Sequence, residues 1–285
     1  MKLLVTGVTG FLGRHTISSL LSQPGIELIC TARNIPQWLE EKNTRFIPWN
    51  LAQSPKENLY DHFERPDALL HLAWQGLPDY KNPLHETIYL EQQVNFLDAL
   101  IAGGLKNITV TGTCLEYGKQ EGMLNEEVRC TPVVPYARAK HRLHEHLQTH
   151  GDAIQLNWVR LFYIYGEGQF PSSLLPQLIA ALERGDEAFR MSPGDQVRDF
   201  IPAEEAATIL SHIVQSRTAW GTLNLCRGNP VTVKDFVLQQ LDALGRMIKL
   251  ETGYYPYPDY EPFQFWGDRT KLNFVLENGK EHLTR

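Results

Sequence analysis

The sequence has few cysteines, and their spacing excludes the sites that cysteines usually build. Four cysteines occur in 285 residues, and they match neither a zinc-binding motif nor a disulfide framework. We expect them to be reduced thiols of a cytoplasmic protein. Their positions are Cys30, Cys114, Cys130 and Cys226.

The sequence also lacks a long apolar run and an excess of positive charge. No apolar stretch approaches the roughly 20 residues of a membrane span. The segment 1–5 leads into a glycine-rich loop without the apolar region of a signal peptide. Asp and Glu number 33 against 27 Lys and Arg, which gives a net charge of −6. We therefore expect a cytoplasmic protein with neither a membrane nor a nucleic-acid partner.

The first half of the chain alternates short apolar runs with helix-length segments. This alternation predicts an α/β fold of the Rossmann type, with a doubly wound parallel sheet and helices on both faces. Strands are expected at 2–6, 27–31, 68–72, 107–111, 155–161 and 222–225. Helices are expected at 11–22, 84–103 and 136–149.

The later part of the chain breaks this alternation and predicts a second, smaller domain. Residues 163–203 are richer in proline and glycine, and residues 253–268 are dense in aromatics and proline. We predict a dinucleotide-binding domain over 1–165, joined by about 204–227. The substrate-binding domain is expected over 166–203 and 228–285.

A glycine-rich motif lies between the first expected strand and the first expected helix. In its G-x-x-G-x-x-G pattern, the first glycine permits a tight turn and the second lets backbone approach a pyrophosphate. The third lets the helix pack close to the strand, and the phosphates would lie on the amides of the helix N-terminus. Cofactor contacts are expected from Gly7, Thr9, Gly10, Phe11, Leu12 and Gly13.

The end of the second expected strand indicates the choice of cofactor. An NAD enzyme usually places a carboxylate here to bind the ribose 2′-hydroxyl, but no Asp or Glu lies between 31 and 39. Arg33 instead offers a cation that can pair with a 2′-phosphate. The sequence therefore favours NADP(H), with NAD(H) possible.

A tyrosine and a lysine lie four residues apart on the helix expected at 136–149, and so share one face. An ammonium beside a phenol favours the phenolate, so Lys140 is expected to bring the Tyr136 pKa toward neutrality. Such a tyrosine can exchange a proton with a substrate oxygen. Thr113, near the end of the strand that begins at 107, can hydrogen-bond the same oxygen. We expect these three residues to be catalytic, with Tyr136 and Lys140 also contacting the cofactor.

Together these motifs resemble the extended short-chain dehydrogenases/reductases of the nucleotide-sugar epimerase/dehydratase type. The resemblance covers nearly the whole chain and includes the segments 5–13, 71–73, 111–118, 159–166 and 198–201. It places Val94-Asn95 where the family has a structural asparagine. It implies a nucleotide-sugar substrate and a homodimer formed through the helices near 84–103 and 136–149.

The resemblance implies further contacts with cofactor and substrate. Arg198 is expected to contact the diphosphate of a nucleotide-sugar, and Tyr163 occupies the place of the family's diphosphate-contacting asparagine; Arg160 can be structural. Gln75 is expected to face the substrate. Further cofactor contacts are expected from Asn50, Leu51, Leu72, Ala73 and Trp74.

The two residues that directly follow Thr113 exclude the 4,6-dehydratase reaction of the family. The 4,6-dehydratases carry an Asp-Glu pair there, which moves a proton and expels water. This chain has Cys114 and Leu115, and neither can do that work at neutral pH. Glu116 comes one residue later and, on a strand, would point to the other face.

Three functions remain at this point. The first is an NADPH-dependent reductase of a nucleotide-activated 4-keto-6-deoxyhexose, in the biosynthesis of deoxysugar precursors of surface polysaccharides such as lipopolysaccharide O-antigen. The second is a nucleotide-sugar 4-epimerase that retains its cofactor. The third is an NADP-binding sensor without catalysis, which the intact Thr113, Tyr136 and Lys140 argue against.

Four histidines lie along 141–150, and a metal site there would need an i,i+4 pair with a third ligand. Among the four, only His146 and His150 form such a pair. We expect a solvated helix surface or a subunit contact here and no metal site.

Overall fold

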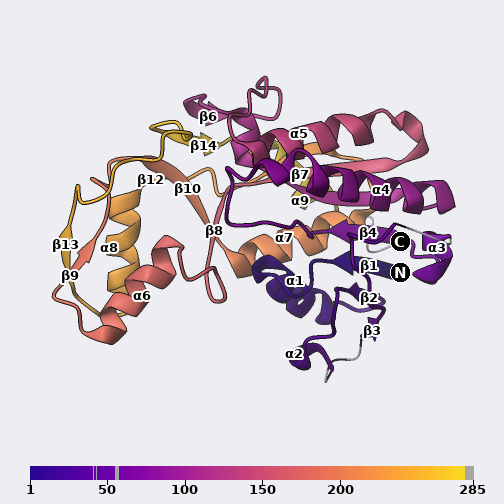
Figure 1. The fold of residues 1–285 in the computed structure, drawn as a ribbon, viewed down its shortest axis with the longest axis horizontal. Helices are drawn as coiled ribbons and strands as arrows, with labels where there is room; N and C mark the ends of the chain where they lie inside the picture. Colours follow the sequence, from indigo (N-terminus) through magenta and orange to yellow (C-terminus); the bar gives the residue numbers. More distant parts are fainter. Residues whose placement is uncertain (41, 43, 55–57, 280–285) are drawn as a thin grey trace.

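The computed structural model describes residues 1–40, 42, 44–54 and 58–279. The last residues of the predicted second domain, 280–285, lie outside the described residues. The chain forms a larger part around a parallel sheet and a smaller part built mainly from later residues (Figure 1). The exact domain boundaries stay a prediction.

A seven-stranded parallel sheet forms the centre of the larger part, which confirms the predicted fold class. In spatial order its strands are β11 (Gly221–Leu225), β7 (Gln155–Leu161), β5 (Asn107–Thr113), β4 (Ala68–His71), β1 (Lys2–Thr6), β2 (Glu27–Thr31) and β3 (Arg45–Phe46). The order reverses direction at β1, so the loops after β1 and β4 meet at the same edge. Ligands bind at such a switch point in open α/β sheets.

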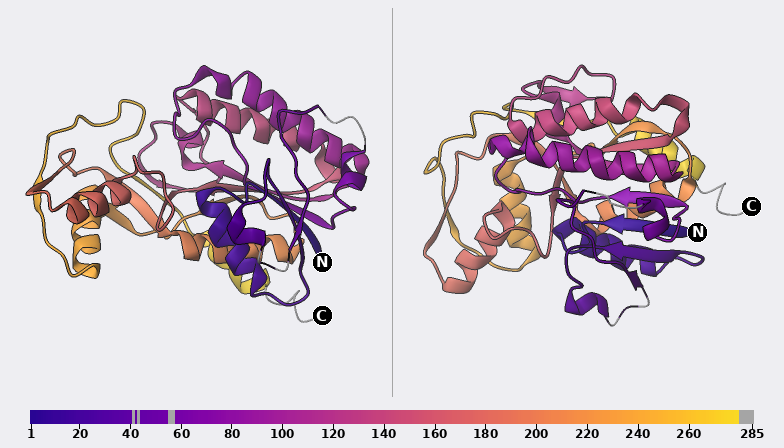
Figure 2. Two further views of the ribbon diagram at one scale, coloured as in Figure 1. Left: turned by 60° about the horizontal axis from the view of Figure 1, so that its bottom comes forward. Right: turned by 45° about the vertical axis from the view of Figure 1, so that its right-hand side comes forward.

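Helices cover both faces of the sheet because strand side chains alternate between the faces. On β1, Leu3 and Val5 enter one core, while Leu4 enters the other. The first core contains α1 (Phe11–Leu21), α7 (Ala203–Ser216) and α9 (Thr270–Asn278). The second contains α3 (Leu59–His62), α4 (Ile88–Gly103) and α5 (Pro135–Gln148). Figure 2 shows these two helical layers from further directions.

The smaller part packs two helices and short strands around a core of its own. Its helices are α6 (Leu174–Arg184) and α8 (Val233–Ala243), which share one apolar cluster. Three small sheets accompany them: β12 (Pro230–Thr232) with β10 (Val197–Pro202) and β8 (Tyr163–Tyr165); β13 (Lys249–Glu251) with β9 (Ala188–Arg190); and β14 (Phe265–Gly267) with β6 (Gly122–Leu124). A short helix, α2 (Gln37–Glu40), lies between β2 and β3.

Two expected elements differ from the structure by more than one residue at an end. The helix expected at 84–103 begins at Ile88, because Thr87 leaves helical geometry with ψ −91°, and a separate 3₁₀ turn spans Pro83–His85. The strand that begins at 107 continues to Thr113. Glu116 lies on a 3₁₀ helix (Cys114–Tyr117) rather than on a strand, so the expectation based on strand alternation is wrong in its geometry.

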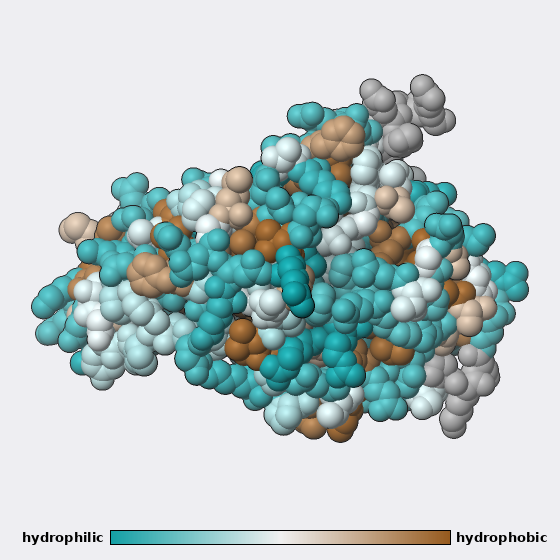
Figure 3. Space-filling view, turned by 90° about the horizontal axis from the view of Figure 1, so that it is seen from above, coloured by the Kyte–Doolittle hydropathy of each residue, from teal (hydrophilic) through white to brown (hydrophobic). Residues whose placement is uncertain are grey.

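No helix in the described part of the chain is long and apolar enough to cross a membrane. On the face that Figure 3 shows, hydrophobic residues form separate patches among hydrophilic ones. Scattered apolar residues of this kind are ordinary on a protein surface.

Candidate functional site

The glycine-rich loop joins β1 to α1, and each glycine meets a steric need. Gly7 has φ +71°, and a Cβ there would lie 2.7 Å from the backbone nitrogen of Ala73. A Cβ on Gly13 would lie 2.2 Å from the Gly7 carbonyl oxygen, so only glycine lets α1 pack this closely. Thr9 and Gly10 are exposed at the N-terminus of α1. This open row of amides fits the phosphates of a dinucleotide.

A directional chain of hydrogen bonds ties the loop to β4 and α4. The Ala73 amide donates to Thr6 Oγ1 at 3.2 Å, and the Thr6 hydroxyl lies 2.9 Å from His71 Nδ1. The other ring nitrogen of His71 lies 2.5 Å from Gln93 Oε1, and Gln93 Nε2 donates to Gln75 Oε1 at 2.8 Å. Because Gln93 Oε1 can only accept, His71 carries its proton on Nε2 and accepts from Thr6.

Gln75, in the loop after β4, ends this series of hydrogen bonds and joins the loop to α4. Its Nε2 donates to Gln92 Oε1 at 2.9 Å, and its Oε1 accepts from Gln93. Both ends of the amide therefore have protein partners, which fixes the orientation of the loop that follows β4. Leu72 and Ala73, expected at the cofactor, lie half-buried in this loop against Gly7.

Tyr136 and Lys140 occupy the first turns of α5, where both contact Trp74 of the loop after β4. Tyr136 is 8% exposed and Lys140 is 1% exposed. Lys140 Nζ donates to the Thr111 carbonyl at 2.6 Å and lies 4.3 Å from the centre of the Trp74 ring. The ammonium is thus held between β5 and an aromatic face, a favourable place for a buried cation.

The structure corrects the expectation for the Tyr136 pKa. Burial raises this pKa well above its usual value, and the neighbouring Tyr80 and Glu116 raise it further; the hydrogen bond with Thr113 opposes them. Burial also lowers the pKa of Lys140 to about 7. Lys140 therefore does not bring the Tyr136 pKa toward neutrality, because desolvation disfavours both charged forms. Tyr136 keeps its proton at neutral pH in this arrangement.

His85 is a buried neighbour of Tyr136 that sequence reasoning missed. Trp74 Nε1 donates to His85 Nδ1 at 3.0 Å, so the ring proton is on Nε2, which donates to the Asp79 carbonyl at 2.8 Å. The His85 ring centre lies 5.4 Å from that of Tyr136. His85 therefore fixes Trp74, and Trp74 covers Lys140. Only the fold brings this 3₁₀ turn to the start of α5.

Thr113 lies at the end of β5 and is 7% exposed. Its hydroxyl accepts from the Leu115 amide at 3.3 Å, and Glu116 accepts from the Thr113 amide at 2.8 Å. Glu116 is fully buried, with Trp158 Nε1 at 3.0 Å and Arg160 Nε at 3.1 Å from its carboxylate. Glu116 and Arg160 thus form a buried pair that supports the Thr113 turn from behind.

The residues expected at the adenosine end lie beyond the carboxyl ends of β2 and β3. Arg33 is exposed and has no hydrogen bond or ion pair within the described part of the chain. Asn50 and Leu51 are half-buried, and Asn50 Oδ1 accepts from the Ala52 amide at 3.1 Å. These positions leave the Arg33 guanidinium available to an anion.

Arg198 and Tyr163 come together in the smaller part of the molecule. Arg198 is 1% exposed, and its guanidinium donates to the Glu261 carboxylate at 2.8 Å and to the Phe263 carbonyl at 3.0 Å. Its Cζ lies 5.5 Å from the centre of the Tyr163 ring. In this structure Arg198 is thus satisfied by the segment that precedes β14. Glu261 is the partner that sequence reasoning missed.

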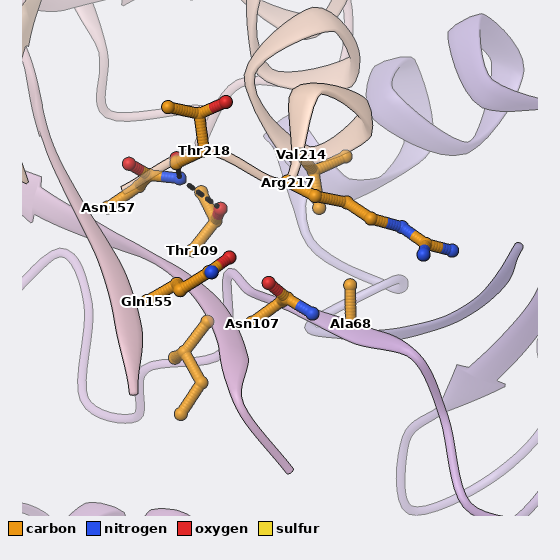
Figure 4. A pocket seen from close by; sticks show the side chains of 9 residues that line it. Ala68, Asn107, Thr109, Gln155, Asn157, Val214, Arg217 and Thr218 are labelled. Carbon is orange, nitrogen blue, oxygen red and sulfur yellow. Dashed lines mark hydrogen bonds between the residues drawn. The ribbon is translucent and has the colours of Figure 1, made fainter. Parts of the chain in front are cut away.

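Two cavities lie away from these residues. One of about 10 Å³, drawn in Figure 4, lies at the amino ends of β4, β5 and β7 and has room for about one water. The other, of about 470 Å³, lies between α6 and the loop after β8. Its lining includes Glu167, Glu183 and Glu204, three carboxylates that disfavour an anionic ligand.

The structure does not give Asn95 the structural role that the resemblance implies. Asn95 is exposed, whereas Gln93, two residues earlier, is fully buried and holds His71. The expectation for Asn95 is therefore wrong. Helical spacing contained the signal, because Gln93 lies three and four residues from the buried Phe96 and Leu97.

The parallel sheet, the glycine loop after β1 and the Tyr-Lys pair on α5 fit the extended short-chain dehydrogenases/reductases. The model of the NAD dependent epimerase/dehydratase family matches residues 3–226. The chain belongs to this family, which confirms the resemblance drawn from its motifs.

Two relatives from Aggregatibacter actinomycetemcomitans match nearly the whole chain. A dTDP-6-deoxy-L-talose 4-dehydrogenase (NAD(+)) is 25% identical over 272 residues, which cover 94% of this chain and 99% of the relative. A GDP-6-deoxy-D-talose 4-dehydrogenase is 27% identical over 286 residues, which cover 98% and 92%. Among solved structures, MoeE5 in complex with UDP-glucuronic acid and NAD is similar with a TM-score of 0.79 and 25% identity, over 97% of this chain and 93% of that one.

Proposed function

We propose that this protein reduces a nucleotide-activated 4-keto-6-deoxyhexose at C4 with NADPH. The observation that carries the proposal is the convergence of Tyr136, Lys140 and Thr113 at the ends of β5 and α5, next to the glycine loop. A hydroxyl, a phenol and an ammonium at one place suit proton transfer to a sugar oxygen.

Each residue has a distinct role in the proposed reaction. NADPH supplies the hydride that reduces C4. Tyr136 donates its proton to the C4 oxygen, and Thr113 orients that oxygen by a hydrogen bond. Lys140 would hold the nicotinamide ribose. The Trp74 ring lies over the Lys140 ammonium, and His85 holds Trp74 in place.

One observation favours reduction over 4-epimerisation. Two relatives carry 4-dehydrogenase names that specify 6-deoxy sugars, and a 4-dehydrogenase run backwards is a 4-ketoreductase. The 4-epimerase is the alternative, because it uses the same three residues to give and take a proton at the C4 oxygen.

The preference for NADPH rests on Arg33. Its guanidinium is exposed and has no ion pair within the described residues, so it can pair with a 2′-phosphate. One relative and several similar structures carry NAD in their names. The cofactor preference is therefore a proposal about Arg33 in this chain.

We also propose Arg198 and Tyr163 as part of the substrate site and a homodimer as the assembly. Binding of a diphosphate at Arg198 requires Glu261 to leave the guanidinium, since the two lie 2.8 Å apart. The dimer would form through α4 and α5. Light scattering at micromolar concentration tests it, and a purely 32.6 kDa species would contradict it.

The experiment for the proposed function is a panel of 4-keto-6-deoxyhexoses on different nucleoside diphosphates, incubated with NADPH. At least one member should be reduced with loss of NADPH absorbance. The same panel with Tyr136→Phe should show little turnover. Failure of every 4-keto sugar nucleotide, with C4 epimerisation of a 4-hydroxy sugar nucleotide instead, would replace the reductase by the epimerase.

A further inference from the structure

Three side chains that commonly bind metals converge between α4 and α5, away from the candidate site. Asp98 lies on α4, His146 on the last turn of α5 and His150 two residues after its end. His146 Nε2 lies 2.9 and 3.0 Å from the two Asp98 carboxylate oxygens, and His150 Nε2 lies 3.1 Å from Oδ1. The sequence offers the histidine pair, and the fold supplies the third ligand.

The arrangement has the dimensions of a tetrahedral site. Zinc bonds of about 2.0–2.2 Å to His and Asp place neighbouring ligand atoms about 3.3–3.5 Å apart. One ligand atom from each of the three residues lies within 4.8 Å of the others. The two distances from histidine to Asp98 oxygens therefore need to lengthen by only a few tenths of an ångström. The two imidazoles meet edge to face, with ring centres 5.6 Å apart at 86°, and both Nε2 atoms point to Asp98 Oδ1.

We propose that Asp98, His146 and His150 form a binding site for one divalent transition-metal ion, such as zinc, with water as the fourth ligand. Two imidazoles and a carboxylate suit such ions. The three side chains are 38%, 35% and 24% exposed, so an ion can enter from solvent and keep a water. All three ligands come from one chain, so the ligand set is complete without a second chain.

A second cluster of metal-binding side chains is less suited to a metal ion than the cluster around Asp98. Glu116, Cys130 and His141 also bring one ligand atom each within 4.8 Å. There, however, Arg160 already provides a cation, 3.1 Å from Glu116 and 3.0 Å from Cys130 Sγ. Like charge disfavours a metal ion beside that guanidinium. Among the described residues, the Asp98 carboxylate has only imidazole nitrogens as hydrogen-bond or ion-pair partners.

The proposed site joins two helices at a distance from the candidate active site. Asp98 and His146 are 48 residues apart in sequence, so one ion links α4 to the end of α5. His146 is ten residues beyond Tyr136, which corresponds to about 15 Å along a helix. We therefore expect the ion to stabilise the fold and leave the chemistry at Tyr136 unchanged, because a ligand that binds only the folded state favours it.

The test uses the full chain stripped of metal with a chelator and then titrated with Zn²⁺ by calorimetry and with Co²⁺ by visible absorption. We expect one ion per chain, the absorption of tetrahedral Co²⁺ and a higher Tm with Zn²⁺. His146→Gln, His150→Gln and Asp98→Asn should each weaken Zn²⁺ binding by about 100-fold or more, since even outer partners of metal ligands cost 10- to 100-fold. The matched control is His141→Gln, on the same helix, which should bind like the wild type.

Each result decides the proposal. Loss of binding in the three ligand variants, with normal binding by His141→Gln, supports it. Equal binding by the wild type and His150→Gln, or loss of binding only in His141→Gln, overturns it. A variant that fails to fold is recognised by its circular dichroism, and the remaining two ligand variants then carry the test.

Discussion

The residues at the two ends of α5 differ in burial and in the partners that surround them, although fewer than fifteen residues separate them. At the first end, Tyr136 and Lys140 are buried among aromatic rings and have shifted pKa values. At the other end, His146 and His150 are partly exposed and share one carboxylate. A single helix thus provides a desolvated site for proton transfer and a solvent-accessible site for an ion. The neighbouring elements, rather than the helix, make the difference.

The cause of this contrast is the loop between β4 and α4. It brings Trp74 and His85 over the first turns of α5 and removes water from Tyr136 and Lys140. Nothing comparable covers the last turn among the described residues, where α4 contributes Asp98 alone to the two histidines. The predictions below compare the buried end, the middle and the exposed end of the helix.

The largest expected effect is at the buried end. Tyr136→Phe keeps the ring and its packing but removes the proton donor, so turnover should fall by about 10²- to 10⁴-fold. Binding of NADPH should remain close to that of the wild type. Steady-state kinetics and a cofactor titration measure both quantities.

The control for this variant is Tyr254→Phe, which removes a phenol that is 52% exposed and should leave turnover unchanged. If Tyr136→Phe turned over at the wild-type rate, the proton-donor role would be wrong. Thr113→Val should have a milder effect than Tyr136→Phe, because the phenol still reaches the substrate oxygen.

The next effect is a loss of stability when the buried Glu116–Arg160 ion pair beside Thr113 is broken. Glu116→Gln leaves the Arg160 guanidinium buried without its carboxylate, and breaking such a pair costs about 3–5 kcal/mol. Chemical denaturation should show this loss. The exposed pair Arg190–Glu251 is the control, and Glu251→Gln should leave the denaturation midpoint where it is. Equal midpoints for Glu116→Gln and the wild type would show that the buried pair adds nothing.

Cofactor preference is expected to change through a single exposed residue. Arg33→Asp places a negative charge opposite a 2′-phosphate and should weaken NADPH binding by roughly one to two orders of magnitude, the range of a charge-assisted hydrogen bond. In the same variant, NADH binding should improve relative to NADPH binding. Arg65→Asp makes the same charge change at an exposed position before β4, at the opposite edge of the sheet, and should leave NADPH binding unchanged. A wild-type preference for NADH would contradict the role of Arg33.

A smaller effect is expected from pH, through the middle of α5. Burial lowers the pKa of His144 and of His71 to about 3, from the usual 6.5. Between these values the unfolded chain binds more protons than the folded one, so stability falls as pH drops from about 6.5 toward 3. His144→Phe keeps the stack on Trp158, whose ring centre is 4.7 Å away.

The measurement for this prediction is the free energy of unfolding across that pH range. His144→Phe should lose stability less steeply than the wild type, by up to about 1.4 kcal/mol per pH unit for one group. Identical slopes for the two proteins would mean that His144 does not contribute.

The smallest effect is expected at the exposed end. His150→Gln should change kcat by less than about twofold, because sites this far apart act independently. The same variant should lose metal binding, so the two readouts separate the two ends of the helix. A large fall in kcat without a loss of stability would show that the ends are coupled.

Sequence patterns predicted the elements that follow local rules. The parallel strands, the glycine loop and α5 were predictable because apolar periodicity and glycine spacing are local signals. Residues 163–203 were less predictable: β8, β10 and α6 lie there, but short strands paired with distant partners leave little periodicity in the sequence.

The environment of each site residue could not be predicted in the same way. The Tyr-Lys spacing indicated a catalytic pair, yet its pKa values depend on burial by Trp74 and His85, which reach α5 only through the fold. Likewise, Glu261 is 63 residues from Arg198, and no local pattern joins them. Long-range contacts, rather than local propensity, determine these electrostatics.

The most direct test of the central claim is the fate of the hydride. The protein is incubated with a 4-keto-6-deoxyhexose nucleotide and NADPH that carries deuterium at the transferred position. The account predicts one NADP⁺ formed per product molecule and deuterium bound at C4 of the sugar. Interconversion of C4 epimers with unlabelled product and no net loss of NADPH would contradict it.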